Sequence, residues 1–240
     1  MNPFRRRIQT AMQSGGGAAA FSPTDIAGLQ LWLDASQIAG LNDGDAVATW
    51  SDLSGNALDA TQSTASRRPT YQTSEINSRP AVQFDGTDDF LENVGGSLTL
   101  KDGCTILVVS KAAVAASDTP FLSKETGDVA ALQWNAPAGL SIAESGIAFM
   151  ATEGALGVAT WQIASYTYDG TTARVYRSNT LLGSGAYSSA LLTDNTGFRV
   201  GRDAAVYANA LIAEIIAYNR ELTAGERTQL QTYAAAKYGL

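Results

Sequence analysis

The sequence has no histidine and only one cysteine, Cys104. Without histidine, catalytic triads, proton relays and metal sites that depend on imidazole are excluded. A single cysteine excludes intramolecular disulfides and zinc sites that use two or more thiolates. Any chemistry would therefore depend on carboxylate, tyrosine or lysine side chains. We expect Cys104, which precedes a long apolar run, to be a small core residue.

Long apolar stretches and clustered positive charge are also scarce. No stretch reaches the roughly 18 consecutive apolar residues of a membrane-spanning helix, so we expect no membrane partner. Residues 8–15 are too few and too polar for the apolar part of a secretory signal, which favours folding in a cytoplasm. The net charge of −7 disfavours nucleic-acid binding, which needs clustered lysine and arginine to neutralise phosphates.

Residues 1–23 differ from the remainder in charge and composition. They hold three of the 16 basic residues and no acid, so the remainder carries 13 basic against 23 acidic residues, a balance of −10. A glycine-rich hinge follows the basic segment. A disordered tail has a similar composition, but we predict an anchoring arm that docks on another chain. The arm residues are Phe4, Arg5, Arg6, Arg7 and Ile8.

Residues 24–240 are predicted to form one all-β domain. The 240-residue chain is 45% hydrophobic, which is enough to bury a large core. Short alternating or apolar runs are separated by Gly, Pro, Asn and Asp, as in a β-sandwich. Asp169-Gly170 lies between two such runs and predicts a hairpin whose two turn residues both have positive φ.

A short C-terminal helix is the exception to this pattern. Thr223 and Glu226 have the spacing of a capping box, in which each side chain accepts from the backbone of the other residue. Apolar residues then recur at helical spacing, and Gly239 suits the end of the helix. We therefore predict a single helix that closes the chain.

Several stretches resemble one known family. Residues 84–91 read F-D-G-T-D-D-F-L, residues 28–35 read G-L-Q-L-W-L-D-A, and residues 49–56 read T-W-S-D-L-S-G-N. Together with the C-terminal strand and helix, they resemble the laminin-G-like, concanavalin A-like jelly-roll modules of bacteria and bacteriophages. The resemblance implies a sandwich of two curved antiparallel sheets. In many members of the family the rim loops hold calcium or sugar.

Three carboxylates end the buried strand in this motif. Asp85, Asp88 and Asp89, with Asp34 or Asp52 brought near by the fold, offer hard oxygen ligands for calcium. The alternative is that Asp85-Gly86 makes a tight turn and the other two carboxylates face solvent. Calcium is therefore the one cofactor that the sequence suggests.

Glycan binding needs an aromatic ring at the rim of the sandwich, with polar groups beside it for the hydroxyls. Each such ring also has an alternative role, because it can pack beneath its own loop. The candidate rings in turn-rich surroundings are Trp50, Tyr71, Tyr187 and Tyr207.

The predicted function is structural rather than enzymatic. The sequence lacks the E-x-D-x-x-E strand of laminarinase-type sandwich hydrolases, so we expect no enzyme. The resemblance and the arm favour a bacteriophage virion protein, made in the host cytoplasm and anchored to other virion proteins as a capsid decoration or head-fibre subunit. Its sandwich would display a site for host or environmental glycans. The alternatives are a calcium-assisted bacterial lectin module and a tail or tail-fibre component, and a homo-oligomer is left open.

Overall fold

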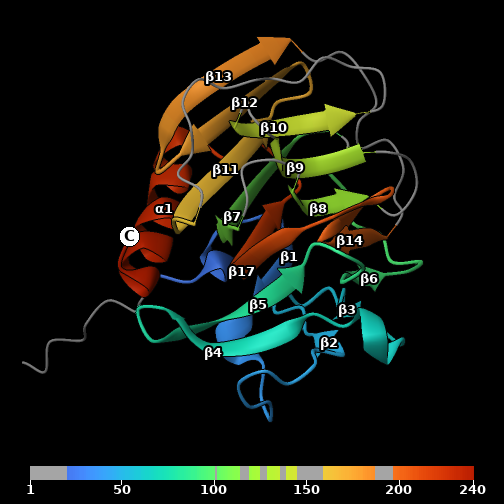
Figure 1. Cartoon of the computed structure of the whole chain (residues 1–240). Helices are drawn as coiled ribbons and strands as arrows, with labels where there is room; N and C mark the ends of the chain where they lie inside the picture. Colours follow the sequence, from blue (N-terminus) through green and yellow to red (C-terminus); the bar gives the residue numbers. More distant parts are fainter. Residues whose placement is uncertain are drawn as a thin grey trace, which may run out of the picture.

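The computed structural model describes residues 21–100, 102–113, 119–124, 129–135, 139–144, 159–186 and 197–240, and describes 129–135 and 139–144 by their backbone. The predicted anchoring arm and Tyr187 lie outside these ranges, so the domain boundary at residue 23 stays a prediction. The described residues form two stacked antiparallel sheets and one α-helix (Figure 1). The all-β prediction is therefore confirmed.

The larger sheet has eight strands, with the last strand of the chain near its centre. That strand, β17, pairs with β7 along one edge and with β5 and then β1 along the other. The order across the sheet is β13-β12-β11-β7-β17-β5-β4, with β1 beside β17. The bounds are β1 (Leu29–Asp34), β4 (Thr70–Ile76), β5 (Arg79–Asp85), β7 (Cys104–Ala112), β11 (Gln162–Tyr168), β12 (Thr172–Arg177), β13 (Thr180–Ala186) and β17 (Asn209–Tyr218).

The second sheet has seven strands in the order β10-β9-β8-β14-β6-β3-β2. A two-stranded hairpin, β15-β16, is separate from both sheets and contacts β8. Three short 3-10 helices complete the described elements. The bounds are β2 (Thr49–Trp50), β3 (Ala60–Thr61), β6 (Leu91–Asn93), β8 (Thr119–Lys124), β9 (Val129–Asn135), β10 (Gly139–Glu144), β14 (Phe198–Val200), β15 (Arg202–Asp203), β16 (Val206–Tyr207), η1 (Pro23–Asp25), η2 (Ala35–Gln37) and η3 (Ala65–Arg67).

Two hydrophobic cores lie on the two faces of the larger sheet. Val82, Phe84 and Ile106 are among the residues packed between the sheets, and Cys104 is buried with them as predicted. Leu107, Val109 and Tyr218 are on the other face, beneath the helix. The central strands β7 and β17 are mostly apolar because both of their faces are buried.

The predicted hairpin joins β11 to β12, but its turn differs from the prediction. Three residues lie between the strands, and only Gly170 has a positive φ, of 94°. The Asp169 carboxylate accepts hydrogen bonds from the amides of Thr171 and Thr172 at 2.9 and 2.7 Å. The Asp169 side chain thus stabilises this turn through hydrogen bonds, whereas a two-residue turn depends on positive φ at both turn positions.

The C-terminal helix α1 (Ala224–Tyr238) confirms the predicted caps. Thr223 and Glu226 make the reciprocal capping-box bonds, and Gly239 ends the helix with a φ of 68°. Arg220 binds the Glu226 carboxylate with two nitrogens, which lowers the pKa of Glu226 to about 2. No described helix is both long and apolar enough to span a membrane.

A bulge in β17 turns one carboxylate toward this helix. The register with β7 shifts between Ile212 and Glu214. A bulge inserts an extra residue, so two successive side chains can leave the strand on the same side. Ala213 and Glu214 both lie on the helix side of the sheet, where the Tyr233 hydroxyl donates to Glu214 at 2.8 Å.

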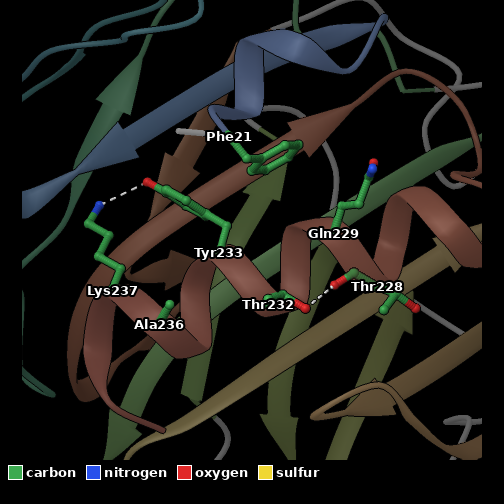
Figure 2. Close-up of a pocket in the computed structure, with 7 residues that line it drawn as sticks. All are labelled: Phe21, Thr228, Gln229, Thr232, Tyr233, Ala236 and Lys237. Carbon is green, nitrogen blue, oxygen red and sulfur yellow. Dashed lines mark hydrogen bonds between the residues drawn. The ribbon is translucent and has the colours of Figure 1, made fainter. Parts of the chain in front are cut away.

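Lys237 forms ion pairs with two buried carboxylates on that side. Asp34 and Glu214 are direct cross-strand partners, and their side chains are 3% and 0% exposed. The Lys237 ammonium lies 2.7 Å from an Asp34 oxygen and 3.0 Å from a Glu214 oxygen. It also donates to the hydroxyl of Tyr233, which faces it from one turn earlier on the helix (Figure 2). The helix is therefore attached to β1 and β17 by charge as well as by apolar packing.

Replacing Lys237 by methionine should lower the free energy of unfolding at pH 7 by about 3–5 kcal/mol, because two buried carboxylates lose their cation. Burial raises the pKa of Glu214, against the opposing effect of Lys237. Without the lysine, Glu214 takes up a proton more readily, so the loss should shrink as the pH falls toward 5. Urea unfolding of both proteins across this pH range measures the effect.

Lys111→Met is the matched control. Lys111 forms a 3.0 Å ion pair with Glu75, but these side chains are 23% and 30% exposed. Exposed pairs contribute little, so this variant should lose less than about 1 kcal/mol. Equal losses in the two variants would contradict the role assigned to Lys237.

Candidate calcium and glycan site

The candidate site lies in the loop between β5 and β6. Gly86 turns the chain with a φ of 77°, and a Cβ atom there would lie 2.8 Å from the Cβ of Asn209. Asn209 starts β17 and pairs with Asp85 at the end of β5. The loop is therefore held against the first residues of the central strand, and only glycine fits at its turn.

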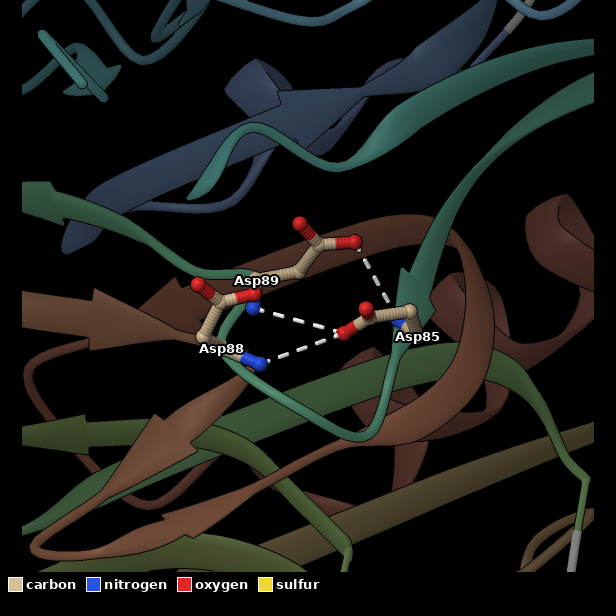
Figure 3. Close-up of side chains that lie close together, drawn as sticks. All are labelled: Asp85, Asp88 and Asp89. Carbon is tan, nitrogen blue, oxygen red and sulfur yellow. Dashed lines mark hydrogen bonds between the residues drawn. The ribbon is translucent and has the colours of Figure 1, made fainter. Parts of the chain in front are cut away.

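The three predicted carboxylates of this loop come together (Figure 3). One potential ligand oxygen from each of Asp85, Asp88 and Asp89 lies within 4.8 Å of the others. One Asp85 oxygen accepts from the amides of Thr87, Asp88 and Asp89 at 2.8, 3.3 and 3.4 Å. Asp89 in turn accepts from the Asp85 amide at 3.2 Å. The backbone thus fixes the carboxylates close to each other.

The electrostatics of the loop favour a cation. Burial, followed by the charge of Asp85, raises the pKa of Asp89 to about 6. Burial also tends to raise the pKa of Asp85, but its three amide hydrogen bonds outweigh that effect and hold the pKa below the ordinary value. No lysine or arginine in the described part of the chain forms an ion pair with these carboxylates. A bound cation would therefore relieve the repulsion among the three carboxylates.

The carboxylate oxygens of the loop are the type of ligand that calcium prefers. Calcium takes six to eight oxygen ligands, and carboxylates bind it through one or both oxygens. Three carboxylates supply at most six such oxygens, and some of these already accept from backbone amides. Backbone carbonyls, water or ligand hydroxyls would have to complete the shell, so the site suits an ion that also contacts a ligand.

Aromatic rings and an arginine lie next to the acidic loop. Phe90 follows Asp89, and its ring centroid is 6.3 Å from that of Tyr207 in β16. The guanidinium carbon of Arg202 lies 4.8 Å from the Phe90 centroid and 5.3 Å from the Tyr207 centroid. Such cation–π contacts fix the half-buried Tyr207 ring in place. The structure therefore places this predicted ring against Phe90, which directly follows the predicted metal ligand Asp89.

The other predicted rings are elsewhere. Trp50 is fully buried in the core between the sheets, so its selection as a rim ring is wrong. Its inward-facing position on β2 follows from the pairing with Ala60, which is equally buried. Tyr71 is only 7% exposed and belongs to the same core, so it too cannot offer a face to a sugar. Tyr187 lies outside the described residues.

Asp34 and Asp52 are not part of the acidic loop. Asp34 pairs with Lys237, and Asp52 accepts from the amides of Trp32, Ser54 and Leu58 at 3.0, 2.9 and 3.0 Å. Glu214 is a buried charged residue that was not among the residues predicted from the sequence. Its single charge inside the apolar run Ile212–Ile216 was the available signal, because a carboxylate in such a strand needs a buried partner.

A shallow groove of about 600 Å³ runs along the exposed side of α1 (Figure 2). Its walls combine Phe21 with side chains from three successive turns of the helix, and Phe21 and Tyr233 meet edge to face at 5.9 Å. The surface of the groove is mostly apolar, although the polar side chains of Thr228, Gln229 and Thr232 also line it.

Comparisons with known proteins identify the fold. Domain 4 of AbnA, an extracellular arabinanase of family GH43 from Geobacillus stearothermophilus in complex with arabinotriose, superposes with a TM-score of 0.62 at 18% identity, covering 85% of this chain and 98% of that domain. The chain has the concanavalin A-like fold. Trypanosoma rangeli sialidase follows with a TM-score of 0.60 at 17% identity, covering 90% of this chain.

The match to the sialidase covers 33% of that protein, so the chain corresponds to about a third of its length. The binding domain of Paraclostridial Mosquitocidal Protein 1 matches with a TM-score of 0.59 at 10% identity, covering 89% of this chain and 53% of that one. No protein-family model and no curated protein matches the sequence. None of these three structures is a virion protein. At these identities the similarity shows the fold alone.

Asp89→Asn should stabilise the calcium-free protein. The folded state raises the pKa of Asp89 to about 6, so the charged carboxylate costs stability above that pH. An asparagine oxygen can still accept from the Asp85 amide. We expect the free energy of unfolding to rise by about 1–2 kcal/mol at pH 7.5 without calcium, and the two proteins to be equal below about pH 4. A gain that persists at low pH would contradict this cause.

Calcium should stabilise the protein more at pH 7.5 than at pH 5, because protonation of Asp89 competes with the ion. For a site of extracellular type, 10 mM calcium should add about 1–3 kcal/mol at the higher pH. Thermal unfolding with calcium, magnesium or EDTA measures this effect. Asp88→Asn should abolish it, whereas Asp43→Asn, an exposed acid of another loop, should keep it. Equal calcium effects in both variants would exclude the loop as the site.

Proposed function

We propose that the chain is a glycan-binding, lectin-like β-sandwich domain whose acidic loop binds sugar with the help of calcium. The observation that carries this proposal is the packing of the Tyr207 ring against Phe90, the residue that directly follows Asp89 of the acidic loop. The fold supports it, because a neighbour of the same architecture has been solved with arabinotriose. We base the proposal on the residues of this chain's own site, and not on the ligand of that neighbour.

Each part of the site has a distinct role in the proposal. The carboxylates of the acidic loop hold the ion, and the ion's remaining coordination positions take hydroxyl groups of the sugar. Tyr207 offers an apolar face to the sugar ring, and Arg202 keeps Tyr207 in position through the stack with Phe90. Binding occurs without bond cleavage, so incubated oligosaccharides should be recovered intact.

The location on a bacteriophage virion stays a prediction. The arm that would anchor the chain, from Phe4 to Ile8, lies outside the described residues, and the comparisons offer no support for viral partners. The proposal of a glycan-binding domain does not depend on that location.

A glycan array probed with the whole chain tests the proposed function. We expect retention on at least one neutral or acidic glycan in 5–10 mM calcium, of the order used for weak calcium sites, and its loss in EDTA. Tyr207→Ala should weaken binding by roughly tenfold, the effect of one lost stacking contact. Absence of retention on every glycan in calcium would overturn the proposal.

Two variants serve as controls in this experiment. Tyr207→Phe keeps the ring and should retain binding. Leu181→Ala removes an exposed apolar side chain, 50% exposed, from β13 on the far edge of the larger sheet and should leave binding unchanged. If Tyr207→Phe loses as much as Tyr207→Ala, the ring face is not the contact.

A further inference from the structure

A polar cavity lies at the opposite end of β5 from the acidic loop. β5 runs from Arg79 to Asp85, so its ends are roughly 20 Å apart. The cavity at the Arg79 end measures about 550 Å³ and lies between β1, η2, the start of β5 and α1. Its lining residues are Trp32, Asp34, Ser36, Gln37, Leu53, Arg79, Tyr233 and Lys237.

Arg79 differs from most half-buried arginines of the domain. Its guanidinium forms no hydrogen bond and no ion pair with any described residue. By contrast, Arg174, Arg199 and Arg220 each bind a carboxylate at 2.6–3.4 Å. Arg79 instead lines a cavity, beside the carboxylate of Asp34, which Lys237 already neutralises. Its five N–H donors therefore have no hydrogen-bond partner among the described residues.

The charges around the cavity balance. Asp34 and the underlying Glu214 are negative, and Lys237 and Arg79 are positive. A ligand with a net charge would disturb this balance, whereas a neutral polar ligand would not. The described walls also combine aromatic area, from Trp32 and Tyr233, with acceptors and donors. Sugars need this combination, because each hydroxyl both donates and accepts while the ring carbons pack on an apolar face.

We propose that this cavity binds a neutral sugar residue, with the guanidinium of Arg79 donating to its hydroxyls and a carboxylate oxygen of Asp34 accepting from them. Gln37, which is exposed at the edge of the cavity, supplies a further amide contact. The inference rests on the proposed glycan-binding function but assigns a second position, which needs no metal ion. Binding here therefore persists when calcium is removed.

The test uses the whole chain and four neutral probes: arabinotriose, xylotriose, mannotriose and cellotriose. Binding is measured in EDTA by saturation-transfer NMR and calorimetry. We expect at least one trisaccharide to bind, Arg79→Ala to weaken it by at least about tenfold, and Gln37→Ala to weaken it by about threefold. Asp88→Asn should leave it unchanged, because that residue belongs to the acidic loop.

Arg177→Ala is the matched control. Arg177 is also half-buried in a strand and also lacks a hydrogen bond or ion pair among the described residues, but it ends β12, on the other side of β17. This variant should bind as the parent does. Thermal unfolding of all variants shows whether a loss of binding reflects a loss of folding.

The outcomes separate this inference from the proposed function. If trisaccharides bind in EDTA but Arg79→Ala and Gln37→Ala bind equally well, the cavity is not the site. If no probe binds in EDTA while glycan retention in calcium remains, the second site is overturned and the proposed function stands. If no glycan binds in either condition, both proposals fail.

Discussion

The domain depends on one ammonium group placed between two carboxylates that would otherwise repel. Asp34 and Glu214 face each other across β1 and β17, and like charges in directly opposed positions destabilise a sheet. Lys237 comes from the last turn of the helix and lies between them. The first and last strands of the domain and its helix thus become one unit. The same group forms a wall of the cavity beside Arg79, so the attachment of the helix also shapes a surface for ligands.

The two ends of β5 use charge in opposite ways. At the Arg79 end, the chain supplies cations to its own buried carboxylates and leaves a balanced, polar hollow. At the Asp85 end, three carboxylates are gathered by backbone amides, with no lysine or arginine in the described ranges to pair with them. At the first end the carboxylates have a cation within the protein, whereas at the second a bound cation would have to supply the positive charge. A single strand of the central sheet holds both ends in fixed relation.

Features that depend on neighbouring residues could be predicted from the sequence. The caps at Thr223 and Gly239 and the clustered acids after Phe84 are set by spacing along the chain, and the structure contains them. Trp50 could not be placed, because its surroundings are polar in sequence while its burial comes from the opposite sheet. The bulge that turns Glu214 toward Lys237 has no local pattern either. Charge pairs between residues 203 positions apart, such as Asp34 and Lys237, depend on the completed fold.

The single thiol gives the domain a built-in reporter. Cys104 begins the central strand β7, has no exposed surface, and burial raises the pKa of its thiol well above the ordinary range. An alkylating reagent must reach the sulfur atom and reacts with its thiolate form. In the folded sheet the sulfur is inaccessible and protonated. The extent of thiol modification therefore reports only those molecules in which the centre of the sandwich has opened. With no second thiol to form a disulfide, the rate of labelling follows a single kind of event, the opening of the central sheet.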